Sequence, residues 1–177
     1  MPATIFQFQV VEGQDWIAPV DSEQFERFFD LDGTAIVDWQ PPLMRLVQQE
    51  ADTAQYSDFP WLGEHAPVLR EPALQALGDT LRRYGQILSL RGERAWLLNV
   101  TRVLADALDE EKSGIVRFDD GSILTVEHYR FRPDAINGVE VFKLPFRGSP
   151  VFVNDVFVER VRRSNLKGVA FEPLWSG

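Results

Sequence analysis

Two tight-turn signals, each set between short apolar runs, constrain the fold of this chain more than any other feature of its sequence. A turn of two or three residues joins antiparallel strands, whereas parallel strands need a crossover of a dozen or more residues. The spacing therefore predicts two antiparallel hairpins and argues against a repeated strand–helix–strand fold. The turns are Arg91-Gly92-Glu93 and Asp119-Asp120-Gly121, and the flanking runs cover residues 86–90, 94–100, 114–118 and 122–131.

Two other segments have the periodicity of amphipathic helices. Residues 71–84 carry Pro72 in the first turn and are followed by Gly85, which suits the position after a helix end. Residues 155–164 form the second segment, and the side chain of either Asn154 or Asp155 can cap a helix there. We therefore predict an α+β fold with a largely antiparallel sheet and these two main helices packed on it. Further strand-like runs lie at 4–11, 139–144, 151–153 and 169–174.

The acidic charge is concentrated at one end of the chain. The formal net charge is −9 over 177 residues. Residues 1–60 hold 11 acidic and two basic residues, whereas residues 61–177 hold 16 of each. We expect a single domain over 1–177, with an acidic N-terminal lobe at about 1–60 and a charge-neutral body at about 61–177. Because phosphates attract a lysine and arginine surplus, this distribution argues against nucleic-acid and anionic-membrane partners.

The composition also limits the chemistry and the location that we expect. The chain has no cysteine, which excludes disulfides, thiolate nucleophiles and cysteine-ligated metals. Its two histidines, His65 and His128, stand apart from any metal-binding motif, so we expect no metal and no cofactor. The longest charge-free stretch, residues 1–11, is shorter than a membrane span of about 20 residues. We expect a cytoplasmic protein without a catalytic constellation, and therefore a binding protein rather than an enzyme.

One motif supports an enzymatic alternative. The segment Asp30-Leu31-Asp32-Gly33-Thr34 resembles the nucleophile motif of the haloacid-dehalogenase phosphatases. That resemblance implies that Asp30 attacks phosphorus and Asp32 acts as acid and base beside Mg²⁺. The motif must end a buried parallel strand, but residues 23–29 are charged and have a helical period. A polar turn is the simpler interpretation, with the Mg²⁺-dependent phosphatase kept as an alternative.

A second resemblance extends over about residues 30–175. The chain is similar to bacterial polymorphic-toxin immunity proteins of the immunity-eleven family, which was first catalogued as a domain of unknown function. The order and spacing of several short stretches carry the resemblance. They are Leu31-Asp32-Gly33, Trp39 with Pro41-Pro42, Asp58-Phe59-Pro60, Leu98-Asn99-Val100-Thr101, Asp106–Glu111, Tyr129-Arg130-Phe131-Arg132-Pro133, Val141-Phe142-Lys143-Leu144-Pro145, Val151-Phe152-Val153-Asn154-Asp155 and Leu166–Leu174.

The resemblance implies a protein that binds a cognate toxin and blocks it, and it transfers no catalytic residue. Toxins that act on nucleic acids carry basic clefts, and an acidic face can fill such a cleft in place of phosphates. We therefore predict a toxin-binding surface with two aromatic anchors, since interface hot spots favour tryptophan. Its predicted acidic members are Asp21, Glu23, Glu26, Asp30, Asp32 and Asp38, and its anchors are Trp39 and Trp61.

Two points stay open from the sequence. The composition is equally consistent with an interaction or scaffold module that has no toxin partner. A homo-oligomer is also possible, because the acidic third of one copy could pair with basic residues on and after the last helix of another. The same pairing could occur within one molecule. The basic residues are Arg160, Arg162, Arg163 and Lys167.

Overall fold

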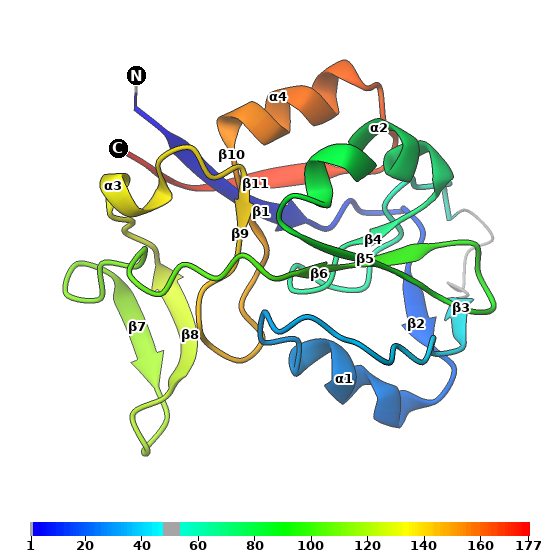
Figure 1. The fold of residues 1–177 in the computed structure, drawn as a ribbon, viewed down its shortest axis with the longest axis horizontal. Helices are drawn as coiled ribbons and strands as arrows, with labels where there is room; N and C mark the ends of the chain where they lie inside the picture. Colours follow the sequence, from blue (N-terminus) through cyan, green and yellow to red (C-terminus); the bar gives the residue numbers. More distant parts are fainter. Residues whose placement is uncertain (1, 48–53) are drawn as a thin grey trace.

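The largest sheet joins the two ends of the chain. The computed structural model describes residues 2–47 and 54–177 (Figure 1). Strand β1 (Thr4–Gln9) lies between β11 (Ala170–Ser176) and β10 (Phe152–Asn154), and β9 (Val141–Phe142) pairs with the far edge of β10. All of these pairs are antiparallel. The first strand is therefore held inside a sheet built from the last third of the chain, as Figure 1 shows for blue β1 beside red β11.

The other strands form three small sheets. The predicted hairpins are both confirmed, as β5 with β6 and as β7 with β8. The predicted α+β fold with largely antiparallel strands is confirmed, and the described strands divide among four sheets. Residue periodicity reveals strands but not the partners of distant ones, whose pairing depends on tertiary contacts. The remaining strands are β2 (Ile17–Pro19), β3 (Met44–Leu46), β4 (Val68–Leu69), β5 (Gly85–Ser89), β6 (Trp96–Val100), β7 (Gly114–Arg117) and β8 (Ile123–His128).

The two predicted main helices are present with shorter bounds. Helix α2 spans Glu71–Leu81 and helix α4 spans Asp155–Arg163. After α2 the hydrogen-bond spacing changes from four residues to three, since the Tyr84 N–H donates to the carbonyl of Leu81. The α-helix therefore ends before residue 84. Of the two predicted cap residues, Asn154 caps α4, with its side chain accepting a hydrogen bond from the Phe157 N–H at 3.0 Å. Shorter helical segments are η1 (Ser22–Gln24), α1 (Phe25–Phe29) and α3 (Pro133–Ile136).

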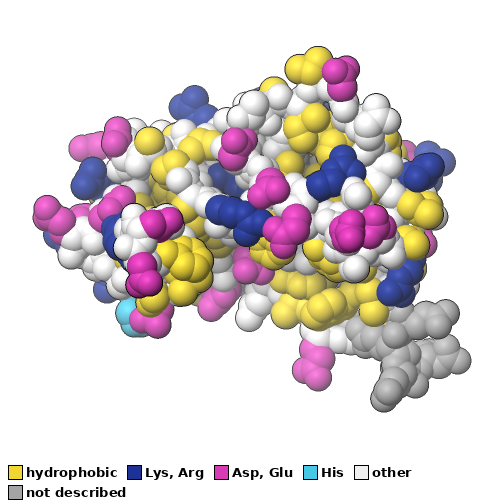
Figure 2. Space-filling model, turned by 90° about the horizontal axis from the view of Figure 1, so that it is seen from below, with side chains coloured by type: hydrophobic (Ala, Val, Ile, Leu, Met, Phe, Trp, Pro, Cys, Tyr) yellow, Lys and Arg dark blue, Asp and Glu magenta, His cyan; other side chains and the backbone are white. Residues whose placement is uncertain are grey.

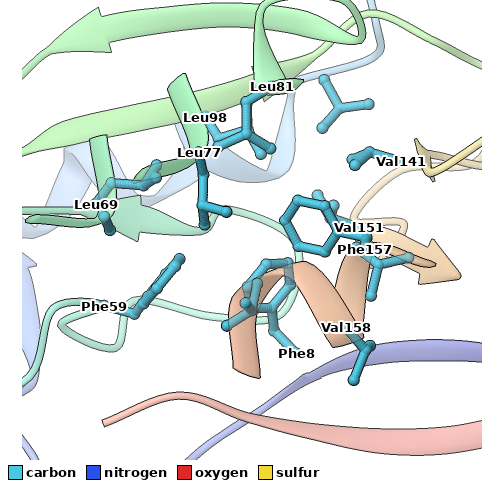
Figure 3. Packing of buried hydrophobic residues seen from close by; sticks show 14 residues of the cluster. Phe8, Phe59, Leu69, Leu77, Leu81, Leu98, Val141, Val151, Phe157 and Val158 are labelled. Atoms are coloured by element: carbon cyan, nitrogen blue, oxygen red, sulfur yellow. The ribbon is translucent and has the colours of Figure 1, made fainter. Parts of the chain in front are cut away.

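Both main helices bury their apolar faces in one cluster (Figure 3). Helix α2 contributes Leu77 and Leu81, and α4 contributes Phe157 and Val158. Phe8 of β1 lies among them and packs against the Phe157 ring at 6.5 Å between centroids. Burying a side chain of this size stabilises the fold by about 2 kcal/mol. The cluster thus fixes the helices on the sheets, which confirms the packing that their periodicity predicts.

The helices that the structure describes are all short. The longest, α2, has 11 residues. None in residues 2–47 and 54–177 combines the length and the apolar character of a membrane span.

Candidate binding surface

The six predicted acidic side chains all lie on the surface. They are carried by the segment from η1 through α1 and by the extended residues that follow it, at the bottom of Figure 1. Asp21 begins this segment as a helix cap, accepting a hydrogen bond from the Glu23 N–H at 3.0 Å. Two further acidic residues of the predicted lobe, Glu50 and Asp52, lie outside the described residues.

Basic side chains interrupt the acidic surface. The Arg147 guanidinium pairs with Glu26 and also donates to Asp30 at 3.0 Å. Figure 2 shows the side of the molecule on which α1 lies, and acidic side chains there stand among lysine or arginine and apolar groups. Two of the six acids are therefore partly neutralised by a residue that the sequence reasoning missed. Arg147 lies 117 residues from Asp30, and no local pattern connects the two.

Asp32 holds a turn. Its carboxylate accepts a hydrogen bond from the Thr34 N–H at 2.9 Å, and hydrogen bonding to Thr34 lowers the pKa of Asp32. Gly33 between them has a φ of 92°, a left-handed conformation that favours glycine. Asp30 follows the short helix α1 rather than a strand. This is the geometry of a polar turn, and it lacks the strand end that the phosphatase alternative requires before Asp30.

Residues 31–39, here called the acidic strap, have no regular secondary structure. Side chains of the body bind the strap by its backbone. Lys143 Nζ donates to the Leu31 carbonyl at 2.9 Å, and Asn99 Nδ2 donates to the Thr34 carbonyl at 3.2 Å. The strap is thus fixed at its start by two long-range hydrogen bonds.

The second half of the strap is fixed in the same way. The Gln86 amide makes two hydrogen bonds with the Ile36 backbone, accepting from its N–H at 2.8 Å and donating to its carbonyl at 3.0 Å. Further along, Trp39 Nε1 donates to the Ser89 carbonyl at 2.7 Å. These contacts hold Asp32 and Asp38 on a segment that is ordered before any partner binds.

Lys143 is an unusual anchor because its side chain is buried. The residue is 2% exposed, and its ammonium bonds a carbonyl rather than a carboxylate. Burial lowers the pKa of Lys143 to about 8, although the charge of Asp32 acts in the opposite direction. His65 lies nearby, stacked on Phe29 at 4.1 Å between ring centroids. Burial and then the charge of Lys143 lower the pKa of His65 to about 4, so this histidine is a neutral core residue at pH 7.

The two predicted tryptophan anchors are both half-buried. Trp39 is partly occupied, since the Arg27 guanidinium lies 4.8 Å from its ring centre. Trp61 packs against the main apolar cluster. The sequence reasoning missed more exposed apolar side chains in the same part of the chain, and single-sequence patterns gave no signal for their exposure. They are Trp16, Val20, Phe25, Val37 and Leu43.

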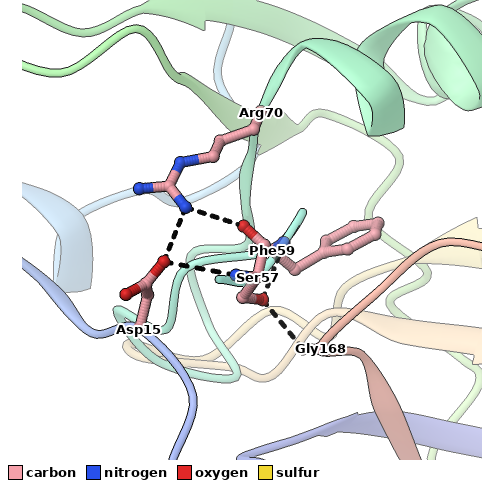
Figure 4. Close-up of polar contacts among 5 residues, drawn as sticks. All are labelled: Asp15, Ser57, Phe59, Arg70 and Gly168. Carbon is pink, nitrogen blue, oxygen red and sulfur yellow. Dashed lines mark hydrogen bonds and ion pairs between the residues drawn. The ribbon is translucent and has the colours of Figure 1, made fainter. Parts of the chain in front are cut away.

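Among the residues that the structure describes, no ion pair joins an acidic side chain of residues 1–60 to the basic side chains on and after the last helix. The Asp58 carboxylate meets Lys167 only through the backbone N–H of Lys167, which donates to it at 2.6 Å. Arg160 pairs with Glu140, and Arg163 pairs with Glu159 on its own helix. Instead, Asp15 pairs with Arg70 at 2.6 Å and also accepts from the Ser57 N–H (Figure 4). The intramolecular pairing considered from the sequence is therefore wrong for these two arginines. The charges of Arg160 and Arg163 are compensated by Glu140 and by Glu159 of the same helix as Arg163.

Comparison with known families agrees with the sequence resemblance. Residues 88–175 match the model of the immunity protein family Imm11. No curated protein matches the chain. The matched region includes Asn99 and Lys143, which bind the strap, and Arg147, which pairs with α1. Through residues 88–175 the chain belongs to the Imm11 immunity protein family.

Proposed function

We propose that this protein binds a cognate bacterial toxin in the cytoplasm and neutralises it through the surface formed by η1, α1 and the acidic strap. The observation that carries the proposal is the link between the family-matched region and this surface. Lys143 and Asn99 lie inside residues 88–175, and both bind the backbone of the strap. The neutral body then acts as a scaffold that presents the acidic segment.

Physical arguments support this division of labour. A segment that is already ordered loses less conformational entropy on binding than a flexible one. Exposed carboxylates attract a basic partner and raise the association rate, chiefly at low ionic strength. Glu23 and Asp38 are exposed and, unlike Glu26 and Asp30, are not paired with Arg147. We therefore assign the steering charge mainly to Glu23 and Asp38, and we keep Trp39 and Trp61 as the apolar contacts.

We expect a toxin gene to lie beside the gene of this protein, and the proposal is tested with the product of that neighbouring gene. The protein and that toxin are expressed together, purified, and titrated against each other in the toxin's own activity assay. We expect growth to be rescued, the two chains to copurify, and inhibition to be complete near one equivalent. A binding inhibitor is consumed stoichiometrically, whereas an enzyme that repairs or modifies a target works at far lower amounts. Rescue by a small fraction of an equivalent, or no rescue and no copurification, would contradict neutralisation by binding. No rescue together with no copurification would favour the scaffold module without a toxin partner.

A further inference from the structure

We infer that the outer face of the β2–β3 ribbon forms the apolar centre of the toxin contact, next to the acidic surface of η1 and α1. The inference rests on the proposed function, since it takes the toxin as the occupant of this face. Strand β2 pairs antiparallel with β3 and leads through Val20 directly into Asp21, the cap of η1. In Figure 1 the two strands lie beside the end of α1 that follows η1. One partner can therefore cover the ribbon and the acidic segment together.

The side chains of the ribbon divide between two faces. Ile17 of β2 and Met44 of β3 point inward, where each is 2% exposed in an apolar cluster. Because side chains alternate along a strand, Trp16 and Val20 point the other way, and they are 41% and 52% exposed. The ribbon thus keeps large apolar side chains in solvent on one face while its other face is packed.

Leu43 extends the exposed face to the second strand. The Val20 N–H donates to the Leu43 carbonyl at 2.8 Å, so these two residues stand opposite each other across the ribbon. Leu43 is 42% exposed. Opposite residues on one face of an antiparallel pair lie within side-chain contact. We call Trp16, Val20 and Leu43 the ribbon patch.

The ribbon patch has the character of an interface centre. Single exposed apolar residues are ordinary, whereas neighbouring large ones mark interaction surfaces, and tryptophan is favoured at interface hot spots. Trp16 also stands next to the predicted anchor Trp61, with which it forms a parallel bridge. The Trp39 ring is covered by the Arg27 guanidinium, but within the described residues no cation lies over the ring of Trp16. Trp16 is therefore the more available anchor.

The charges beside the ribbon patch select its occupant. Asp21 and Glu23 follow Val20 and are exposed, and Arg45 is exposed opposite Ala18 on the patch face. None of these three charged side chains forms an ion pair with the part of the chain that the structure describes.

Acids therefore exceed bases at the border of the patch, and a partner with basic groups around an apolar centre complements it. A second copy of this chain does not. It would bring the same excess of acids to the contact, and two chains of net charge −9 repel each other. We therefore assign the patch to the basic toxin partner rather than to self-association.

The test separates the dissociation rate from the association rate. Buried apolar contacts mainly set how long a complex lasts, whereas exposed charges mainly set how fast it forms. In the complex with the product of the neighbouring gene, Val20→Ser/Leu43→Ser should dissociate about tenfold faster or more, with little change in association. Val116→Ser/Leu124→Ser is the matched control on the β7–β8 hairpin, where the two side chains are 37% and 50% exposed. It should dissociate as the wild type does.

Two further measurements need no altered interface. Hydroxyl-radical footprinting of the wild type should show Trp16 and Leu43 protected in the complex, and Phe118, which is 53% exposed on the hairpin side, unprotected. Sedimentation of the protein alone should show a monomer. Thermal unfolding of both double variants checks that each is folded, which we expect because all four replaced side chains are exposed.

The outcomes distinguish this inference from the proposed function. Wild-type dissociation of the Val20→Ser/Leu43→Ser variant, equal acceleration by the hairpin control, or no protection of Trp16 and Leu43 would refute the ribbon patch while neutralisation stands. A dimer of the protein alone that the Val20→Ser/Leu43→Ser variant breaks would give the patch to a second copy and overturn the assignment. If the wild type forms no complex with the toxin, the proposed function fails, and the inference fails with it.

Discussion

The ammonium group of Lys143 donates a hydrogen bond of 2.9 Å to the backbone carbonyl of Leu31, which lies 112 residues earlier in the chain. This bond connects the family-matched body to the first residue of the acidic strap. A buried lysine is costly, because water no longer solvates its charge. Under the proposed function, this bond holds the acidic strap in one conformation for binding.

Replacing the anchor should loosen the strap without unfolding the protein. In Lys143→Met, the lost hydrogen bond is offset by removal of a buried charge, so the free energy of unfolding at pH 7 should change by less than about 1.5 kcal/mol. Amide hydrogen exchange at Thr34 and Ile36 should become about tenfold faster, because local opening costs less. Exchange measured by NMR on both proteins checks this prediction.

Lys112→Met is the matched control, since Lys112 is exposed and pairs with Asp109 on the surface. It should leave exchange in the strap unchanged. If Lys143→Met also leaves it unchanged, Lys143 is not an anchor.

His65 should make the protein less stable in mild acid. Its pKa is about 4 in the folded state against 6.5 for an unperturbed histidine, so between these values the unfolded state binds a proton that the folded state does not. Stability must therefore fall as the pH drops, by about 2 kcal/mol between pH 7.5 and pH 5. Urea unfolding of the wild type and of His65→Leu at both pH values measures the difference, and this part of the loss should vanish in the variant.

The exposed histidine offers a control for that measurement. His128→Gln, on β8, should retain the same acid loss as the wild type. Equal pH dependence in His65→Leu and the wild type would show that His65 is not the group responsible.

The buried ion pair of Asp15 and Arg70 should contribute far more to stability than an exposed one. Their side chains are 13% exposed for Arg70 and 12% for Asp15, and Arg70 also donates to the Ser57 carbonyl at 3.0 Å. Arg70→Met leaves a buried carboxylate without its cation and should lower the free energy of unfolding by about 3 kcal/mol.

An exposed pair in the same chain provides the comparison. Arg94 pairs with Glu71 at 2.7 Å, with side-chain exposures of 80% and 39%. Arg94→Met should change the free energy of unfolding by less than about 0.5 kcal/mol. Similar losses in the two variants would mean that Arg70 acts through something other than the buried charge of Asp15.

Local features of this fold could be read from the sequence. The turn around Gly92 specifies the β5–β6 hairpin, and the Asn154 cap begins α4 where the pattern predicts. Asn165 has a φ of 53°, the left-handed conformation that asparagine adopts more readily than most residues after a helix end. Each of these depends on contacts between residues near one another in the chain, which a single sequence records directly.

The acidic residues of the candidate site could be predicted from the sequence, but the residues that contact them could not. The six acids are exposed as expected, but the sequence did not reveal that Arg147 pairs with two of them. Lys143 lies in an apolar run, and nothing near it indicates that its ammonium meets the carbonyl of Leu31. Such long-range partners follow from strand pairing across the whole chain, and a pattern of residue types does not contain that information.

The association rate with the cognate toxin that the family match implies tests the central claim most directly. Stopped-flow rates are measured over a range of salt for the wild type, for Glu23→Lys/Asp38→Lys, and for Asp155→Lys/Glu159→Lys, which changes the net charge equally on α4. Helix α4 lies on the opposite side of the molecule from α1 in Figure 1. We predict that the strap-side reversal slows association about tenfold or more at low salt and flattens its salt dependence, while the α4 reversal changes both far less. Equal effects of the two reversals, or no effect of the first, would contradict an acidic toxin-binding surface on α1 and the strap.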